Sequence, residues 1–163
     1  MSRTAQPVAA WVQAVTWVLS LVGLGISGYL TFTHFAGTQY LACSSTGVVN
    51  CGVVTTSAQS YFLGMPVAVL GLAHYVVVSV LTSPWAWRAR AYWIHVTRVV
   101  LVAISMAFVL WLVAAELLII DHICLWCTGV HVVTFALFGV MVSVAPTQLG
   151  WVSGAGESAA PSR

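Results

Sequence analysis

Long apolar stretches with almost no charged residues are the feature that most restricts how this chain can fold. They lie at residues 8–35, 66–82, 92–120 and 124–144. A helix of about 20 apolar residues crosses the hydrocarbon core of a membrane. The chain of 163 residues is 61% hydrophobic and 5% charged, whereas soluble domains have about 25% charged residues. The sequence therefore predicts an all-α integral membrane protein built as a four-transmembrane-helix bundle.

The first apolar stretch is too long for a secretory signal peptide. A signal peptide has an apolar core of about 7–15 residues before a small-residue cleavage site, but residues 8–35 are apolar almost throughout. We therefore expect an uncleaved first helix. Gly23 and Ser27 form a small-xxx-small pair that permits close helix packing. Glycine is also simply more frequent in membrane helices, so close packing is one of two interpretations.

Arginine positions indicate which connections face the cytoplasm. Lysine is absent, and the arginines are Arg3, Arg88, Arg90, Arg98 and Arg163. Most of them lie near the termini or between the second and third helices, and such residues are enriched in cytoplasmic segments. Arg98, early in the third helix, could extend toward the same side. We expect a multi-pass protein of the cell inner membrane or plasma membrane, with both termini cytoplasmic.

The distribution of apolar residues divides the chain into a membrane part and a tail. Residues 1–145 are expected to form the catalytic membrane domain. Residues 146–163 are rich in Gly, Ser, Ala and Pro and predict a disordered cytoplasmic tail. The net charge of +2 is small and its positive residues are scattered, which argues against a nucleic-acid partner. The polar connection at residues 36–60 is expected on the outer side.

Four cysteines form two pairs, both expected on the outer side, where disulfides form. Cys43 and Cys51 lie in the outer loop between the first and second helices, and Cys124 and Cys127 form a Cys-x-x-Cys pair that opens the fourth helix. A helix N-terminus stabilises a thiolate, and Asp121 could cap this helix. Because thiolates attack disulfides, the sequence favours redox chemistry.

Other uses of these cysteines stay open. The pair Cys43 and Cys51 could be only a structural disulfide of the outer loop. Four cysteines could bind zinc, although structural zinc sites usually combine two short-spaced pairs, and the first pair here has seven residues between its members. Haem attachment needs a histidine directly after the second cysteine, where this chain has Thr128. No metal site is therefore favoured.

The order of the motifs resembles the vitamin K epoxide reductase family. Cys43 and Cys51 are followed by Ser57, by a Gly-x-Pro segment at residues 64–66 and by Cys-x-x-Cys at the start of the last helix. The resemblance extends over residues 28–140 and is closer to the bacterial members, because of the Gly-x-Pro segment and the Cys-Leu-Trp-Cys-Thr-Gly-Val-His run. The other quinone-linked disulfide generator of bacterial membranes carries its Cys-x-x-Cys pair before the wider pair, the reverse of the order here.

The resemblance implies a membrane thiol–disulfide oxidoreductase that supports disulfide formation outside the cytoplasm. It implies that Cys43 and Cys51 form the shuttle pair, which takes electrons from a reduced thioredoxin-like protein. Cys124 and Cys127 would form the active pair, with Cys127 beside a quinone, either menaquinone or ubiquinone. Some relatives carry a fused thioredoxin-like domain, and here we expect a separate partner protein.

Two polar residues are candidates for binding the quinone. Ser57 matches the family's hydroxyl position after the second shuttle cysteine. His131 lies four residues after Cys127 on the same helical face and stands where vertebrate members have a tyrosine. Each could place a donor near a quinone oxygen. The alternative for His131 is a histidine hydrogen-bonded to another helix.

Other ionisable and aromatic residues support further expectations. Glu116, near the outer end of the third helix, could relay protons, but the favoured interpretation is that it reaches the membrane interface. His74 and His95 are interpreted as packing residues. Trp126, between the two cysteines of the Cys-x-x-Cys pair, is interpreted first as an interfacial aromatic and second as a lid on the quinone pocket.

A non-enzymatic function is the alternative. The same pattern suits a four-helix membrane scaffold whose disulfides only brace its outer face. Disulfides that change with added quinone or reduced partner would indicate the enzyme, and inert disulfides would indicate the scaffold.

Overall fold

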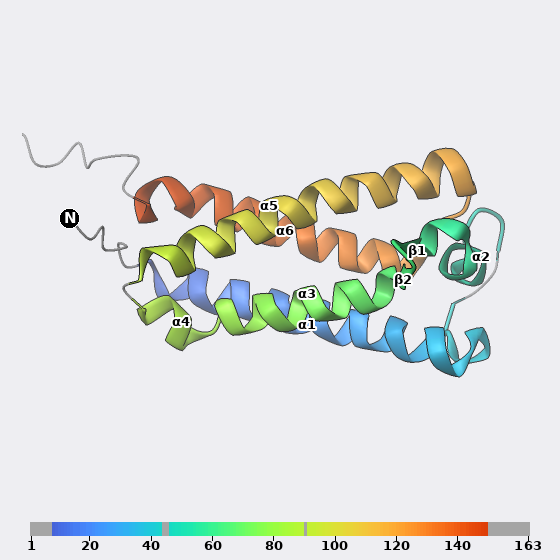
Figure 1. Ribbon diagram of the computed structural model, residues 1–163, viewed down its shortest axis with the longest axis horizontal. Coiled ribbons are helices and arrows are strands. Elements are labelled where there is room, and N and C mark those ends of the chain that lie inside the picture. The colour runs from blue at the N-terminus through green and yellow to red at the C-terminus, as the bar shows by residue number, and fades with distance from the viewer. Residues whose placement is uncertain (1–7, 44–45, 90, 150–163) are drawn as a thin grey trace, which may run out of the picture.

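The apolar stretches fold into helices that lie lengthwise beside one another. The computed structural model describes residues 8–43, 46–89 and 91–149 and is mostly helical. Its long helices are α1 (Ala10–Ala36), α3 (Val67–Leu81), α5 (Tyr92–Ala115) and α6 (Leu125–Gln148). Figure 1 shows these helices aligned with the long axis of the molecule, with α5 and α6 above α3 and α1.

Three helical segments are long and apolar enough to cross a membrane. They are Ala10–Ala36, Tyr92–Ile120 and Leu125–Gln148, and the apolar helix Val67–Leu81 is shorter. At most 28% of the most apolar window of each candidate span is buried inside the bundle, so most of its apolar surface faces outward. A helix that is hydrophobic all round suits a lipid environment. The prediction of an all-α protein with membrane-spanning helices is confirmed to this extent.

The closest packing joins α1 to α3 at small residues. The ring of Tyr75 on α3 lies directly against Gly23 on α1, where a methyl group would overlap with it. Further along the same face, Ser27 meets Gly71 of α3. The hydroxyl of Tyr75 is hydrogen-bonded to Thr134 Oγ1 of α6 at 2.9 Å. The close-packing interpretation of the small-xxx-small pair is therefore confirmed, and a single tyrosine links three helices.

Arg98 organises the end of the bundle that carries α4 (Pro84–Arg88). Its side chain is buried, and Nε and Nη2 donate to the Leu81 carbonyl at 3.0 and 2.6 Å. The guanidinium also lies 3.7 Å from the ring centroid of Trp87. Arg98 extends toward the end of the bundle that carries Arg88, as expected, but its side chain is buried there because the Leu81 carbonyl at the end of α3 binds it. His95 is buried beside it, as a packing residue should be.

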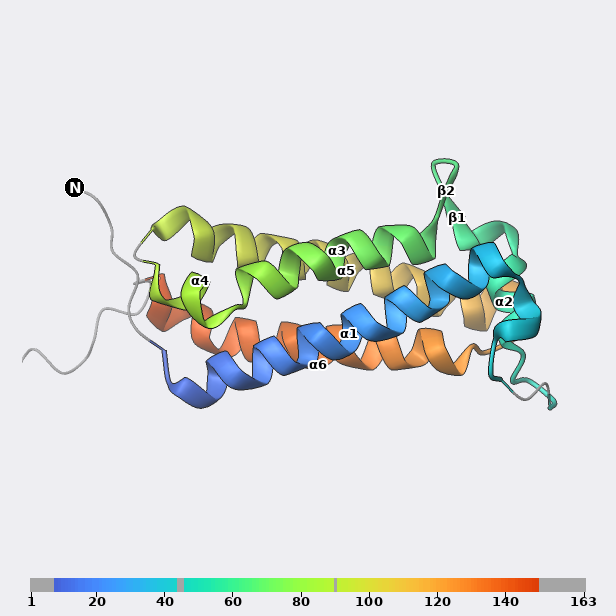
Figure 2. The ribbon, with the colours of Figure 1, turned by 90° about the horizontal axis from the view of Figure 1, so that it is seen from below.

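The opposite end of the bundle carries the connection between α1 and α3 (Figure 2). Leu63 and Gly64 form the two-residue turn of its hairpin with φ of 51° and 80°, the left-handed values that a tight hairpin turn requires. Pro66 is the N-cap of α3, in line with the preference for proline at a helix start. In chain order the connection contains 3-10 turns and short elements: Thr38–Tyr40, α2 (Cys51–Thr56), Ala58–Ser60, β1 (Tyr61–Phe62) and β2 (Met65–Pro66).

The chain between α5 and α6 turns in a way that the sequence did not predict. Helix α5 continues as a π-helical segment, η3 (Glu116–Ile120), which ends at Asp121 in the left-handed conformation with φ of 55°. Asp121 therefore ends one helix and does not cap the next, so the expected capping role is wrong. Cys124 is the N-cap of α6, and its Sγ accepts a hydrogen bond from the Cys127 N–H at 3.2 Å.

Helix α6 is longer than predicted. It extends to Gln148 and includes Pro146 near its end, whereas the sequence predicted an end near residue 144. Most of the tail predicted at residues 146–163 lies outside the described residues.

Candidate redox site and cavity

The two loop cysteines are joined to each other. Cys43 and Cys51 form a disulfide with an Sγ–Sγ distance of 2.00 Å. Cys51 opens α2, where the side chain of Asn50 accepts a hydrogen bond from the Val53 amide and caps the helix. Cys51 is buried, whereas Cys43 is half-buried. A protein thiol that approaches from outside therefore meets Cys43 first.

Backbone hydrogen bonds hold this loop against the segment just before the Cys-x-x-Cys pair. The Ile123 N–H donates to the Val48 carbonyl at 2.8 Å, and the Asn50 N–H donates to the Ile123 carbonyl at 3.1 Å. Cys51 follows Asn50 in the chain, and Cys124 follows Ile123. This register therefore brings one cysteine of each pair to the same place.

Two aromatic side chains hold the residues just before Cys43 in place. The indole N–H of Trp126 donates to the Ala42 carbonyl at 2.9 Å, and its ring lies 4.7 Å from that of Tyr29. The Tyr29 hydroxyl accepts from the Ala42 N–H at 2.7 Å and donates to the Tyr40 carbonyl at 2.8 Å. Trp126 and Tyr29 therefore fix the residues that lead into Cys43.

Cys51 and Cys124 pack in one buried cluster with Val54. Cys124 and Cys127 are both free thiols, and Cys124 is 0% exposed. The pKa of the Cys124 thiol is held below its ordinary value, mainly because its sulfur accepts a hydrogen bond from the Cys127 thiol. The Cys127 backbone N–H adds to this effect, while burial opposes it. Cys124 is thus prepared to become a thiolate beside Cys51.

A cavity of about 330 Å³ lies on the other side of the Cys-x-x-Cys pair. Its mostly apolar wall is formed by α1, α3, α5, α6 and the loop around Ser57. Cys127 lines this cavity, and Cys124 does not. One cysteine of the pair therefore faces the loop disulfide and the other faces the cavity. Trp126 is not part of the wall, so its interpretation as a lid on the pocket is wrong.

Both predicted ligand-binding residues reach this cavity. His131 is 4% exposed and lines the wall, and none of the side-chain hydrogen bonds of the described residues involves it. The alternative of a histidine bonded to another helix is therefore wrong. Ser57 also lines the cavity and donates its hydroxyl proton to the Val54 carbonyl at 2.8 Å. Its oxygen can accept from a ligand, and its proton becomes available when the hydroxyl turns.

Glu116 lines the same cavity, and the expectation that it reaches the membrane interface is wrong. Its side chain is 6% exposed, and its carboxylate is hydrogen-bonded to the backbone of Cys124. The signal for a functional role was present in the sequence, since an ionisable residue inside an apolar helix is a functional candidate by default. The π-helical turn that decides its position carries no obvious mark in the sequence.

The sequence analysis missed further polar residues of the cavity wall. His74, Tyr75 and Thr134 line it, although His74 was interpreted as a packing residue. In the sequence they stand among apolar helical residues, where nothing distinguishes a cavity-lining side chain from a packed one.

The zinc alternative conflicts with the bonding of the cysteines. Two of the four thiolates that such a site requires are joined in the Cys43–Cys51 disulfide. Among the described residues, no group of three or more His, Cys, Asp or Glu side chains could hold a metal ion.

Comparison with known proteins gives a match to a family. A model described as the vitamin K epoxide reductase family matches residues 14–142. This segment includes all four cysteines, Ser57, Glu116 and His131. No curated protein matches the chain.

Proposed function

The chain belongs to the vitamin K epoxide reductase family, and from this premise we propose that it is a quinone-dependent thiol–disulfide oxidoreductase of the bacterial type. Electrons enter from a reduced thioredoxin-like protein at Cys43 and Cys51. They pass to Cys124 and Cys127 and then to a quinone. The reaction supports disulfide formation outside the cytoplasm.

The observation that carries this proposal is the different surroundings of the two Cys-x-x-Cys sulfurs. Cys124 packs against Cys51 of the loop disulfide. Cys127 lines the apolar cavity. The pair therefore connects the loop to the cavity, and among the described residues no other redox group lies between them.

Thiol–disulfide exchange accounts for the first half of the route. A partner thiolate attacks the half-buried Cys43, and a second exchange leaves the partner oxidised and both loop cysteines reduced. The Cys51 thiolate then attacks Cys124 of an oxidised Cys124–Cys127 pair and releases the Cys127 thiolate. The Cys43 thiolate attacks Cys51, so the loop disulfide forms again and Cys124 is released as a thiol. Two electrons have then moved to the active pair.

The cavity suits a quinone head group. Its volume of about 330 Å³, its mostly apolar wall and its few polar side chains are typical of a site for a small apolar ligand. A bound quinone accepts two electrons and two protons. The roles of the chain's own residues are to place Cys127 against the ring and to present Ser57 and His131 to ring oxygens. Menaquinone and ubiquinone both fit this description.

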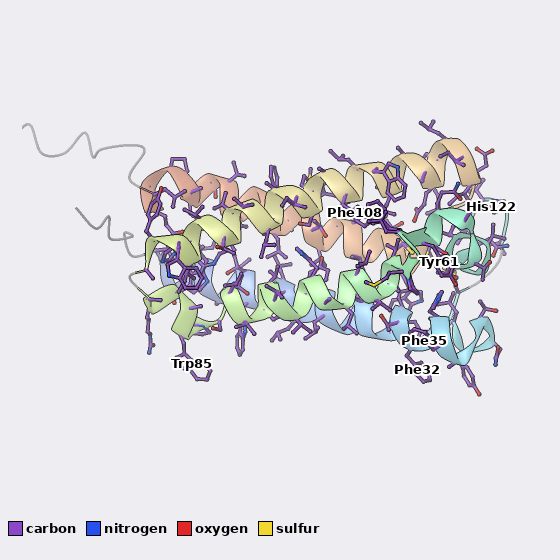
Figure 3. The ribbon with its side chains drawn as sticks, in the orientation of Figure 1. Phe32, Phe35, Tyr61, Trp85, Phe108 and His122 are labelled. Carbon is purple, nitrogen blue, oxygen red and sulfur yellow. A yellow bond between two sulfur atoms is a disulfide. The ribbon has the colours of Figure 1, made fainter. Side chains whose placement is uncertain are left out.

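We place the bundle upright in the membrane of the cell, with α3 as a fourth crossing and the cysteine end outside the cytoplasm. Aromatic side chains project at both ends of the bundle, Trp85 from α4 and Phe32 and Phe35 from the end of α1 near the cysteine loop (Figure 3). Aromatic residues are enriched at both membrane interfaces. Arg88 lies at the α4 end, which the positive-inside rule assigns to the cytoplasm.

We assign the electron donor to a separate protein with a thioredoxin-like dithiol. The loop around Cys43 offers exposed apolar side chains for docking, including Tyr40 at 56% and Val48 at 63% exposed. Such a partner would cover the half-buried sulfur of Cys43.

Quinone reduction by the purified protein tests the proposal. We expect the full chain to reduce ubiquinone or menaquinone when a reduced thioredoxin-like protein is supplied, and to oxidise that protein in equal amount. A scaffold with bracing disulfides would transfer no electrons to either quinone, and its cysteines would keep the same oxidation state throughout.

A further inference from the structure

Glu116 is an acidic side chain in the wall of a mostly apolar cavity. No lysine or arginine among the described residues lines this cavity. The titratable side chains that share the wall are Cys127 and His131 from α6, His74 and Tyr75 from α3, and His34 from α1. Burying a carboxylate without a cationic partner is unfavourable, so the presence of Glu116 at this position calls for a chemical reason.

The contacts of Glu116 connect it to the active pair. Its carboxylate is hydrogen-bonded to the backbone of Cys124 and interacts electrostatically with the thiols of both Cys124 and Cys127. Glu116 is also the first residue of the π-helical segment η3. Single π-helical turns often occur at functional sites.

The chemistry of the pair requires a proton acceptor at this point. When Cys124 and Cys127 form a disulfide, both thiols lose their protons. Cys127 faces the cavity and can pass its proton there. Cys124 is 0% exposed and does not line the cavity, so its proton has no direct path. The Glu116 carboxylate is next to Cys124 and inside the cavity.

We propose that Glu116 is the proton acceptor for Cys124 and carries that proton into the cavity. The proposal rests on the quinone-dependent function proposed above. In the balanced step both S–H bonds break, one S–S bond forms, and two electrons and two protons pass to the quinone, which is reduced to a quinol. The Cys124 proton moves to a Glu116 oxygen as the Cys124 thiolate attacks Cys127. It then moves from Glu116 to an oxygen of the electron acceptor, which regenerates the carboxylate.

Removal of the Glu116 charge should change two measured rates in opposite directions, the alkylation of Cys124 and the reduction of quinone. The carboxylate raises the pKa of the Cys124 thiol by repelling the thiolate, so its removal makes Cys124 easier to ionise. Its removal also takes away the proton acceptor, so electron transfer becomes slower. Damage to the fold alone would not produce this combination.

The experiment uses the full chain in a Cys43→Ala/Cys51→Ala background, in which only the active pair can react. Alkylation of Cys124 by iodoacetamide is followed by peptide mapping at neutral pH without quinone. Electron flow from dithiothreitol to ubiquinone is measured in the same preparations. For Glu116→Gln we expect alkylation at least about threefold faster, since more thiolate is present. We expect quinone reduction about 100-fold slower, a typical loss for a general acid or base.

Two matched variants complete the test. Asp121→Asn removes an exposed carboxylate five residues away in the chain, and it should change neither rate. Glu116→Asp keeps the carboxylate and should recover part of the quinone reduction lost in Glu116→Gln. The proposal would be overturned if Glu116→Gln reduced quinone at a rate within twofold of the Cys43→Ala/Cys51→Ala parent. It would also be overturned if both Cys124 alkylation and quinone reduction became slower. If the parent itself reduces no quinone, the proposed function fails, and unchanged alkylation in Glu116→Gln would then refute the coupling to Cys124.

Discussion

At the scale of single residues, the central feature is that Cys124 and Cys127 have different surroundings. Their positions three residues apart at a helix start suggested that one faces the loop and the other faces the bundle. The structure adds the particular neighbours, namely Cys51 beside Cys124 and the cavity beside Cys127. Two predictions follow from this difference.

The first prediction concerns the spectrum of the active pair. In Cys124→Ala, Cys127 cannot form its disulfide, so its thiolate should remain beside a bound quinone. We expect a long-wavelength charge-transfer absorbance band in this variant, because little water competes in an apolar cavity. Cys127→Ala serves as the matched control and should show no band. A band in Cys127→Ala alone would reverse the assignment of the two cysteines.

The second prediction concerns the pH dependence of Cys124. Its lowered pKa means that the thiolate, the form that reacts with alkylating agents, appears at lower pH than in an ordinary cysteine of pKa about 8.5. The alkylation rate of Cys124 should therefore rise with pH and reach its plateau at a lower pH than that of an ordinary cysteine. Cys127→Ala removes the hydrogen bond from the Cys127 thiol, which is the main cause of the lowered pKa. The midpoint of the pH profile of Cys124 alkylation should therefore move to higher pH. Peptide-resolved alkylation of the quinone-free protein measures both midpoints, and an unchanged midpoint would contradict this origin of the shift.

At the scale of elements, the sequence predicted the helices well and their junctions poorly. Apolar length identifies a membrane helix without reference to the rest of the fold, and α3 begins directly after Pro66 as expected. Asp121 was misinterpreted because its residue type suits both a helix cap and a left-handed turn, and only the path of the chain decides between them. The loop could be placed near Cys124 only through a resemblance, since its register depends on backbone bonds to Ile123.

The third prediction concerns the contact between α1 and α3. Gly23→Ala would push a methyl group into the ring of Tyr75, and overpacking of this kind costs about 1–3 kcal/mol of unfolding free energy. Gly25→Ala is the matched control, because a methyl group there would meet no atom within 4 Å. Thermal unfolding in detergent should show a lower midpoint for Gly23→Ala only. Equal midpoints would show that α1 and α3 are not held this closely.

At the scale of the whole molecule, the loop disulfide and the cavity lie on different sides of the Cys124–Cys127 pair. The disulfide lies in the connection between α1 and α3, and the cavity is lined by residues of the four long helices and of this connection. The cavity could not be predicted, because its wall combines residues from distant parts of the chain. The arginine pattern predicts the orientation, which places all four cysteines outside the cytoplasm.

The fourth prediction tests this orientation. After mild reduction, a thiol reagent that cannot cross membranes should label Cys43 from the outer face of intact cells or spheroplasts. Inverted vesicles provide the opposite face as a control and should show no labelling until the membrane is dissolved. Labelling of Cys43 only from the cytoplasmic face would overturn the topology.

Electron flow from two kinds of donor tests the whole route most directly. In Cys43→Ala/Cys51→Ala, flow from a reduced thioredoxin-like protein to quinone should stop, because the protein donor cannot reach the buried Cys124. Flow from dithiothreitol to quinone should continue, because Cys51→Ala removes a sulfur packed beside Cys124 and leaves room there for a small reductant. Unchanged flow from the protein donor, or an equal loss with both donors, would contradict a route that enters at the loop disulfide and leaves through Cys127.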